Sequence, residues 1–430
     1  MTNETVVQRE TFQVSEMAEN LIGSEIIKIA TEVREKIKKG NHIYNYTIGD
    51  FDPHIFPIPS ELRDEIIKAL IAGATNYPEA NGLVELRNEV SAFLEERQGL
   101  KYSPDEVVIS CGARPLIYAI YRTLVDSGDK VIFPVPSWNN NHYCHMSGAE
   151  TVEIPTKAEF NFMPTAAELK PHLKNTTLIA LCSPLNPTGT TFGKEQLEEI
   201  CDLILEENAR RGDSESPLYL MYDQIYWVLT YGNTKHHDPV SLRPEMRNYT
   251  VFVDGLSKCF AATGLRVGWS VGPRHITDRM PAILSHVGAW APKAEQLATA
   301  NFLANKTAVD AFLNNFKSEV SERLNALYEG FLNLKNDGFR VNVIAPQAAI
   351  YLTVQFDLAG SQTSNGVVLK NARDITKFLL DEAHLAVVPF YAFGSDDNNN
   401  WFRISVGTCD KKEIPDLLNR LKQALYSLKS

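Results

Sequence analysis

The sequence predicts an α/β protein with a mostly parallel sheet, followed by a smaller α+β region. Short β-rich runs alternate with helical or looped stretches in the middle of the chain, which is typical of a parallel sheet. Several of these runs are almost continuously apolar, as expected for strands that are covered on both faces. At roughly 100–200 residues per domain, the 430 residues indicate two or three compact units.

The first elements are expected to be helical, with one short strand between them. A helix is predicted at 24–39, where apolar positions recur at helical spacing and Gly40 follows as a stop signal. A short strand from Tyr46 then leads into an irregular, proline-rich loop that ends near Pro59. Further helices are predicted at 60–72, 83–97 and 115–126.

The β-rich runs of the predicted sheet follow next. They lie at 131–134, 177–182, 218–222, 250–253 and 267–271, with an amphipathic helix at 194–210. A long helical region at 294–335 separates the sheet from the C-terminal region. That region mixes strands and helices, which are predicted at 339–344, 349–356, 371–383, 385–388, 402–406 and 411–427.

Composition and charge exclude several classes of protein. With 44% apolar and 22% charged residues, the chain is neither collagen-like nor disordered. A net charge of −11 argues against a non-specific nucleic-acid binder. No apolar run approaches the ~18 residues of a membrane span, and no signal peptide is visible, so we expect a cytoplasmic protein. The six cysteines form no Cys-x-x-Cys pair, and we expect no metal site.

Polar side chains follow three of the predicted strands. Asn186 comes after the strand at 177–182, Asp223 and Tyr226 come after the next, and Lys258 comes after the third. In open α/β sheets, ligands bind outside the carboxyl ends of the strands. An amide, a carboxylate, a phenol and an amine are therefore expected to converge at one edge of the sheet.

These groups match the chemistry of pyridoxal 5′-phosphate. An amine can form a Schiff base with its aldehyde, and a carboxylate can keep its ring nitrogen protonated so that the ring accepts carbanion electrons. Arg266, which follows Lys258 at a short offset, is suited to bidentate pairing with its phosphate. Neither a Gly-x-Gly-x-x-Gly motif after a strand nor a P-loop is present.

The segment SKCFAATGLRVG at 257–268 resembles the lysine signature of the class I/II aminotransferases, which are fold type I pyridoxal-phosphate enzymes. Further markers of this family occur in order along the chain: IGD at 48–50, YPEANGLVELR at 77–87, GAR at 112–114, PSW at 136–138, NPTG at 186–189, YDQIY at 222–226 and FRIS at 402–405. The resemblance implies a large domain with a seven-stranded sheet at 60–300. It also implies a small domain from 20–59 and 301–430, and an N-terminal arm at 1–19.

The resemblance assigns the cofactor's ring to a set of side chains. Lys258 should form the Schiff base and then move the proton, and Asp223 should contact the ring nitrogen. Tyr226 and Asn186 should contact the phenolic oxygen, and Trp138 should stack on the ring. Ser257 is also expected among the cofactor-binding residues.

The phosphate of the cofactor is expected at the N-terminus of the helix that begins within residues 112–115. A glycine-led turn with proline at the first helical position exposes free backbone N–H groups to an anion. This site would consist of Gly112, Ala113 and Arg114. The resemblance adds Arg266, and Tyr77 from the neighbouring subunit of a homodimer. It also assigns the substrate's α-carboxylate to Arg403, with Gly49, Trp138 and Asn186 beside it.

The chain departs from the family pattern at three places. Gly255 replaces a serine that binds phosphate, Phe390 replaces a glycine after Pro389, and Ala348 replaces another glycine. Phe390 and Tyr391, and also Trp290 and Lys293, are candidates to line the substrate pocket.

The resulting hypothesis is an aminotransferase with a ping-pong mechanism. An L-amino acid, with aspartate or an aromatic or neutral residue as donor, passes its amino group to a 2-oxo acid, expected to be 2-oxoglutarate. A β-eliminating lyase or decarboxylase of the same fold is the alternative. A pyridoxal-phosphate-fold regulator and a catalytically silent protein are more remote, because no DNA-binding segment precedes Gly49 and the reactive residues are present.

Overall fold

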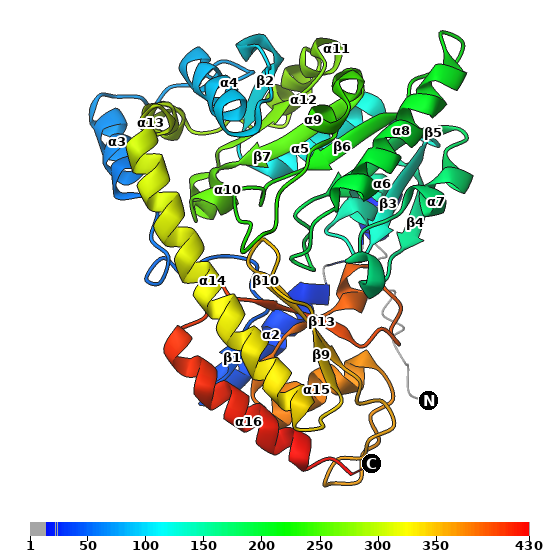
Figure 1. The fold of residues 1–430 in the computed structure, drawn as a ribbon. Coiled ribbons are helices and arrows are strands. Elements are labelled where there is room, and N and C mark those ends of the chain that lie inside the picture. The colour runs from blue at the N-terminus through cyan, green and yellow to red at the C-terminus, as the bar shows by residue number, and fades with distance from the viewer. Residues whose placement is uncertain (1–13, 22, 24, 430) are drawn as a thin grey trace, which may run out of the picture.

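The computed structural model describes residues 14–21, 23 and 25–429, which are built around a seven-stranded sheet (Figure 1). The strand order is β2-β8-β7-β6-β5-β3-β4. The strands are β2 Val107–Ser110, β3 Lys130–Val135, β4 Glu150–Pro155, β5 Thr176–Cys182, β6 Tyr219–Asp223, β7 Thr250–Gly255 and β8 Gly268–Val271. Only the pairs that involve β8 are antiparallel. The prediction of a mostly parallel sheet is confirmed.

Two strands of this sheet, β2 and β4, were not expected from the sequence. β2 is four residues long and wholly buried, so its apolar run is too short to stand out. β4 lies at the edge of the sheet, and of its six residues only Ile154 is buried. An edge strand is partly solvated and lacks the continuous apolar run that marks the inner strands.

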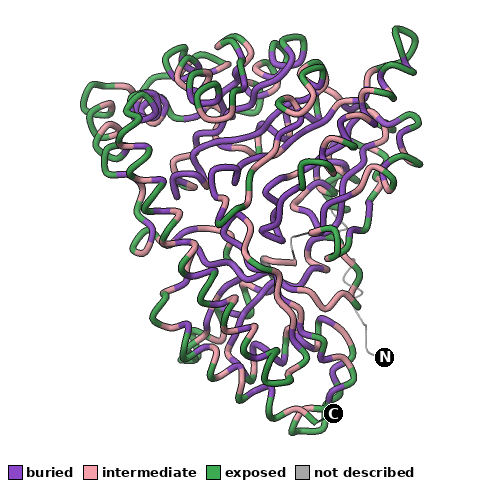
Figure 2. The backbone as a smooth tube through the Cα atoms, in the orientation of Figure 1, coloured by how far each residue is buried: buried purple, intermediate pink, exposed green. Residues whose placement is uncertain are grey.

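Both faces of the sheet are covered, which explains the continuous apolar runs. In β5, Leu178 and Ala180 belong to one hydrophobic cluster, and Ile179 and Leu181 belong to another. This alternation follows from the two-residue period of a strand, and Figure 2 shows the inner strands as buried. Among the helices that contribute to these clusters are α5 Ala113–Leu124 and α12 Met280–His286 for the first, and α4 Val84–Gln98 and α8 Lys194–Arg211 for the second.

A smaller antiparallel sheet with four strands among the described residues lies beside the large one (Figure 1). Its strand order is β12-β13-β10-β9, with β9 Val341–Val343, β10 Tyr351–Phe356, β12 Val388–Pro389 and β13 Trp401–Ser405. Three helices pack around it: α14 Lys306–Asn336, α15 Ala372–Glu382 and α16 Ile414–Tyr426. The long helix α14 runs from the large sheet to the small one (Figure 1).

The N-terminal segment joins this C-terminal region. β1 Tyr44–Asn45 pairs in parallel with β11 Leu385–Ala386. Lys36, on α2 Glu25–Lys38, forms an ion pair with Asp381 at 2.5 Å. The boundaries of the two predicted domains stay a prediction. Most of the predicted arm lies outside the described residues, whose first element is α1 Glu16–Glu19.

The predicted helices occur close to their expected ranges, with two differences. The helical region at 294–335 is divided into α13 Lys293–Ala304 and α14 by Asn305, whose side chain accepts a hydrogen bond from the backbone N–H of Ala308. α5 begins at Ala113, so Pro115 occupies its third position, where a missing N–H still removes no intrahelical bond. The remaining α-helices are α3 Ser60–Ile71, α6 Asn140–Ser147, α7 Ala166–Leu169, α9 Pro239–Leu242, α10 Leu256–Cys259 and α11 Arg274–Thr277.

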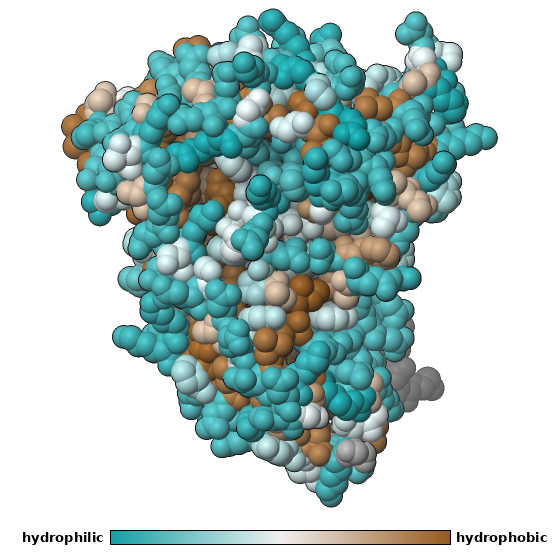
Figure 3. Space-filling view, viewed as in Figure 1, coloured by the Kyte–Doolittle hydropathy of each residue, from teal (hydrophilic) through white to brown (hydrophobic). Residues whose placement is uncertain are grey.

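Hydrophilic side chains cover most of the face shown in Figure 3. Within the described ranges, we find no helix with both the length and the apolar character needed to cross a membrane.

Aromatic side chains fix the loop after β1 onto helix α14. The ring of Phe316 lies 5.3 Å from that of Phe51 and 5.6 Å from that of Phe56, measured between centroids. Phe316 is buried, with 3% of its surface exposed. Because this loop also carries Gly49, the aromatic cluster positions a segment that the sequence assigns to the substrate site.

Replacing Phe316 by alanine should lower the free energy of unfolding by about 3–5 kcal/mol, because it removes a buried ring and leaves a cavity. Urea denaturation measures this change. Asn315→Ala, at an exposed position of the same helix, is the control and should change stability by less than about 0.5 kcal/mol. Equal stabilities for the two variants would contradict the anchoring role of Phe316.

Candidate active site

A cavity of about 650 Å³ lies at the carboxyl ends of β5, β6 and β7. The structure brings most of the predicted site residues to its wall: Gly49, Ala113, Arg114, Trp138, Asn186, Asp223, Tyr226, Ser257, Lys258, Arg266 and Arg403. The register of the strands explains this arrangement, because Cys182 pairs with Asp223 and Asp223 pairs with Val253. Residues that follow these three strands therefore emerge at one edge.

Lys258 lies on the short helix α10, directly after β7, and its amine reaches into the cavity. Nζ donates a hydrogen bond to the carbonyl oxygen of Gly49 at 2.5 Å. Burial lowers the pKa of Lys258 to about 8, and the positive charges of Arg403 and Arg114 act in the same direction. A substantial fraction of this amine is therefore neutral at mildly alkaline pH, as a nucleophile or base requires.

Asp223 ends β6 and faces the cavity without a cationic partner among the described residues. Its Oδ1 accepts a hydrogen bond from the backbone N–H of Ile225 at 3.1 Å. Burial raises the pKa of Asp223 to about 6. A bound group with a protonated nitrogen would stabilise the ionised form of this carboxylate.

Arg403, on β13, is a buried guanidinium with 1% of its surface exposed. Nη1 donates to Oδ1 of Asn186 at 2.9 Å, and Nη2 donates to the carbonyl oxygen of Thr47 at 2.6 Å. Nε has no hydrogen-bond partner, and within the described chain no carboxylate pairs with this side chain. A buried charge without a counter-ion is unfavourable, so the geometry fits an anionic ligand at this point.

Arg266 closes the opposite side of the cavity beside the start of α5. Its guanidinium donates to the carbonyl oxygens of Thr263 and Cys111 at 2.8 and 2.9 Å. A β-carbon on Gly112 would collide with this guanidinium, so Gly112 contacts Arg266 although it does not itself line the cavity. A β-carbon on Gly268 would meet the backbone N of Ala113 at 2.8 Å. Glycines thus allow Arg266 and the first turn of α5 to meet at a potential anion site.

The cations of the cavity outnumber its acids. Among the lining residues, the charged side chains are Lys258, Arg114, Arg266 and Arg403 against Asp50 and Asp223. Asp50 accepts a hydrogen bond from the Thr263 hydroxyl at 2.5 Å. Arg114 is exposed and lies 5.2 Å from the ring centroid of Trp138. This imbalance favours a ligand with more than one negative group.

Several predicted residues lie away from this cavity. The ring of Tyr77 is 80% exposed and lies 5.1 Å from that of Trp290. Both residues, with Lys293, line a separate surface cavity of about 720 Å³. Trp290, Lys293 and Tyr77 therefore do not line the main cavity of a single chain, and their expected roles near a dimer interface stay predictions.

Phe390 and Tyr391 also lie outside the cavity wall. Phe390 is fully buried, and its ring lies 5.2 Å from that of Phe162. Tyr391 contacts Arg373, whose guanidinium lies 4.1 Å from the ring centroid. The expectation that these two residues re-line the substrate entrance is not supported, because hydrophobic packing and this cation–π contact hold them elsewhere.

Other residues of the wall were not assigned a role from the sequence, among them Thr47, Asp50, Cys182 and Tyr351. Thr47 acts through its backbone carbonyl, which carries no sequence signal. Tyr351 lies in an apolar run, and such a run predicts only a buried strand. In the described residues, no group of three or more His, Cys, Asp and Glu side chains is placed to hold a metal ion.

The fold and the cavity define an enzyme that transfers amino groups. A profile of aminotransferase class I and II matches residues 45–421, and the chain belongs to this family. It is 28% identical over 384 residues to an aspartate aminotransferase of Geobacillus stearothermophilus, covering 88% of this chain and 91% of that protein. It is also 32% identical over 346 residues to an aspartate aminotransferase of Pinus pinaster, covering 80% of this chain and 68% of that protein.

Solved structures agree with this assignment. An aspartate aminotransferase from Rhizobium meliloti superimposes with a TM-score of 0.89 at 26% identity, covering 97% of this chain and all of that chain. An aspartate aminotransferase from Thermus thermophilus with maleate superimposes with a TM-score of 0.84 at 25% identity, covering 96% of this chain and all of that chain. The prediction of an α/β aminotransferase fold is therefore confirmed.

The close surroundings of Gly255 explain why this chain has no serine at the position where the family pattern has one. Gly255 pairs with Gly268 of β8. A β-carbon at position 255 would lie 2.7 Å from Cα of Gly268 and 2.8 Å from the carbonyl oxygen of Val267. These contacts are too short for any side chain, so the two strands approach closely only because both positions are glycine.

Gly255→Ser should therefore destabilise the protein by about 1–3 kcal/mol through overpacking, and should not tighten the binding of pyridoxal phosphate. Chemical denaturation and a cofactor titration measure the two effects. Gly193→Ser, at a position with open space around it, is the matched control. Tighter cofactor binding at unchanged stability would show that a serine hydroxyl is tolerated at 255.

Proposed function

We propose that this aminotransferase uses pyridoxal 5′-phosphate to move the amino group of an L-amino acid to a 2-oxo acid by a ping-pong mechanism. The observation that carries the proposal is a set of three side chains in one cavity. They are the amine of Lys258, whose pKa is lowered by burial, and the carboxylate of Asp223 and the guanidinium of Arg403, neither of which forms an ion pair among the described residues. Members of this family depend on pyridoxal phosphate.

The cavity residues fit this cofactor. Its phosphate would meet Arg266, Ser257 and the N-terminal turn of α5, where no side chain caps the free N–H groups. Its ring nitrogen would meet Asp223, and its phenolic oxygen would meet Tyr226 and Asn186. When bound, pyridoxal phosphate supplies an electron sink for the pair of electrons left at the substrate's α-carbon.

The protein's own side chains then hold and move protons. Asp223, as a carboxylate, would keep a proton on the ring nitrogen. Nζ of Lys258, once released, would take the proton from the α-carbon, for which a pKa of about 8 is well suited. Arg403 would bind the α-carboxylate in bidentate fashion, while its bonds to Asn186 and Thr47 fix the orientation of its guanidinium.

A dicarboxylic substrate pair, such as aspartate and 2-oxoglutarate, is the preferred form of this proposal. Arg114 supports it, because its exposed guanidinium lies over Trp138 and forms no ion pair within the part of the chain that the structure describes. A second carboxylate would provide the missing counter-charge. The relatives described above, which are named aspartate aminotransferases, also support this choice. Aromatic or neutral donors are the alternative.

We further infer a homodimer in which Tyr77 reaches the phosphate of the neighbouring subunit. Tyr77 and Ile71 are 80% and 82% exposed, which is unusual for apolar or aromatic side chains so close in sequence. Tyr77 lines the surface cavity that includes Trp290, as does Leu70, the chain neighbour of Ile71. A second copy would cover this face and bring Tyr77 to a cavity that it cannot reach in its own chain.

The proposed function is tested with protein reconstituted with pyridoxal phosphate. The parent should show a visible absorbance band and form glutamate from aspartate and 2-oxoglutarate. Lys258→Ala should lose this band, and its transfer rate should fall at least about 100-fold, because the base and the attachment point are removed together. Spectrophotometry and amino-acid analysis measure both outcomes.

Lys235→Ala, which removes an exposed lysine outside the cavity, is the control and should behave like the parent. A band that persists in Lys258→Ala would contradict the assignment of this residue. Release of ammonia and pyruvate in place of a new amino acid would instead indicate the β-eliminating lyase.

Arg114→Gln should reduce kcat/KM for aspartate by roughly 10-fold, because it removes one charge-assisted contact, and should leave kcat/KM for alanine almost unchanged. Arg122→Gln, on the same helix but outside the cavity wall, is the matched control. A similar loss for both substrates in Arg114→Gln would assign Arg114 to the phosphate instead.

A further inference from the structure

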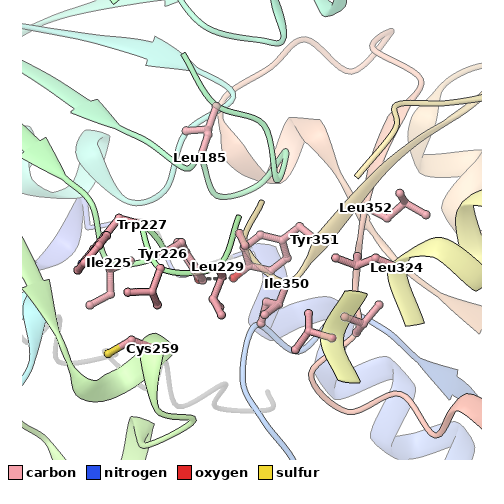
Figure 4. Packing of buried hydrophobic residues seen from close by; sticks show 14 of the residues in the cluster. Leu185, Ile225, Tyr226, Trp227, Leu229, Cys259, Leu324, Ile350, Tyr351 and Leu352 are labelled. Atoms are coloured by element: carbon pink, nitrogen blue, oxygen red, sulfur yellow. Dashed lines mark hydrogen bonds between the residues drawn. The ribbon is translucent and has the colours of Figure 1, made fainter. Parts of the chain in front are cut away.

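Two buried tyrosines from different sheets meet at the cavity wall. Tyr226 follows β6 of the large sheet, and Tyr351 begins β10 of the small one. Their hydroxyl oxygens lie 2.5 Å apart, and their rings meet edge to face with centroids 5.5 Å apart (Figure 4). They are 2% and 1% exposed. This hydrogen bond therefore links the two parts of the fold at the site.

The surroundings hold Tyr351 in a single position. The guanidinium of Arg403 lies 4.7 Å from its ring centroid. A β-carbon on Gly49 would lie 2.9 Å from its hydroxyl oxygen, and one on Gly189 would collide with its backbone carbonyl. Tyr351 thus fills space that two glycines leave open, and its hydroxyl has little freedom to turn away from Tyr226.

The direction of this hydrogen bond follows from counting protons. Each hydroxyl has one proton, and among the described residues Tyr226 is the hydrogen-bond partner of the Tyr351 hydroxyl. If Tyr226 donated to Tyr351, it would have no proton left to donate to a ligand in the cavity. If Tyr351 donates, the Tyr226 proton is free to point into the cavity, where the proposed function places an acceptor.

Both hydroxyls keep their protons in this environment, because burial raises the pKa of both tyrosines. The charged and titratable groups that face the pair are Lys258 on α10, Arg403 on β13, Cys182 on β5 and Asp50 in the loop after β1.

We propose that Tyr351 is a positioning residue for Tyr226: its hydroxyl donates to the Tyr226 oxygen and thereby turns the Tyr226 proton toward the phenolic oxygen of the cofactor. This inference rests on the proposed function. Because hydrogen bonds in a chain polarise one another, donation by Tyr351 also strengthens the bond that Tyr226 makes. Tyr351 then influences the protonation of the bound cofactor without contacting it.

A double-mutant cycle on the reconstituted protein tests this role. The readout is the midpoint of the pH titration of the cofactor's visible absorbance, which does not depend on turnover. An oxygen that accepts a strong hydrogen bond from the protein holds a neighbouring proton less tightly. Tyr226→Phe should therefore raise the midpoint by about one pH unit, and Tyr351→Phe should raise it by about 0.3–0.5.

The decisive comparison is the double variant. If Tyr351 acts through Tyr226, adding Tyr351→Phe to Tyr226→Phe should change the midpoint by less than about 0.2 pH unit. Additive shifts, or no shift in Tyr351→Phe alone, would overturn the inference. Absence of any visible band in the parent protein would instead contradict the proposed function, so the two failures are distinguishable.

Two further variants separate a positioning role from a structural one. Tyr231 also donates a buried hydrogen bond across this region, to the carbonyl oxygen of Ala349 at 2.6 Å, but it does not line the cavity. Tyr231→Phe should leave the midpoint unchanged. A fluorinated tyrosine at 351 keeps the shape and donates more strongly, so it should lower the midpoint. If Tyr351→Phe does not fold, the fluorinated variant decides, and an unchanged midpoint would overturn the inference.

Discussion

The parallel register of β5, β6 and β7 is the constraint on which the site depends. Because Cys182 pairs with Asp223 and Asp223 with Val253, the three strands end at the same edge of the sheet. An amide, a carboxylate and an amine, each from a separate strand end, therefore meet without any long loop to guide them. The glycines at 255 and 268 allow β7 and β8 to approach closely, and Gly268 also packs against the start of α5.

The cavity is electrostatically incomplete. Arg403 is buried with an unpartnered Nε, the amine of Lys258 has its pKa lowered by burial, and the carboxyl of Asp223 has its pKa raised by burial. Such groups reduce the stability of the fold, and they are tolerated where a ligand supplies the opposite charge. Such a charge distribution favours a ligand with more than one anionic group and a basic nitrogen.

Most of the large sheet and the placement of Lys258, Asp223 and Asn186 around one cavity could be predicted, because side chains at strand ends leave a pattern in the sequence. Arg403 lies within β13, and only the resemblance to the family pointed to it. β4 was missed because a partly solvated edge strand lacks the continuous run of apolar residues that marks the inner strands. The contribution of Thr47 was missed because any residue supplies a backbone carbonyl. Tyr351 sits in an apolar run, and nothing in that run distinguishes a core tyrosine from one whose hydroxyl reaches the cavity. The role of Tyr77 depends on a second copy, which one chain cannot display.

The guanidinium of Arg403 and the carbonyl of Thr47 that orients it are 356 residues apart in the chain. The strand pairing beside them likewise joins residues near the two ends, in β1 and β11. All strands of the large sheet precede residue 272, so the ribosome delivers them well before it delivers Arg403. A nascent chain can therefore bury its central strands while one wall of the cavity is still missing, and a product terminated before residue 403 would lack that wall.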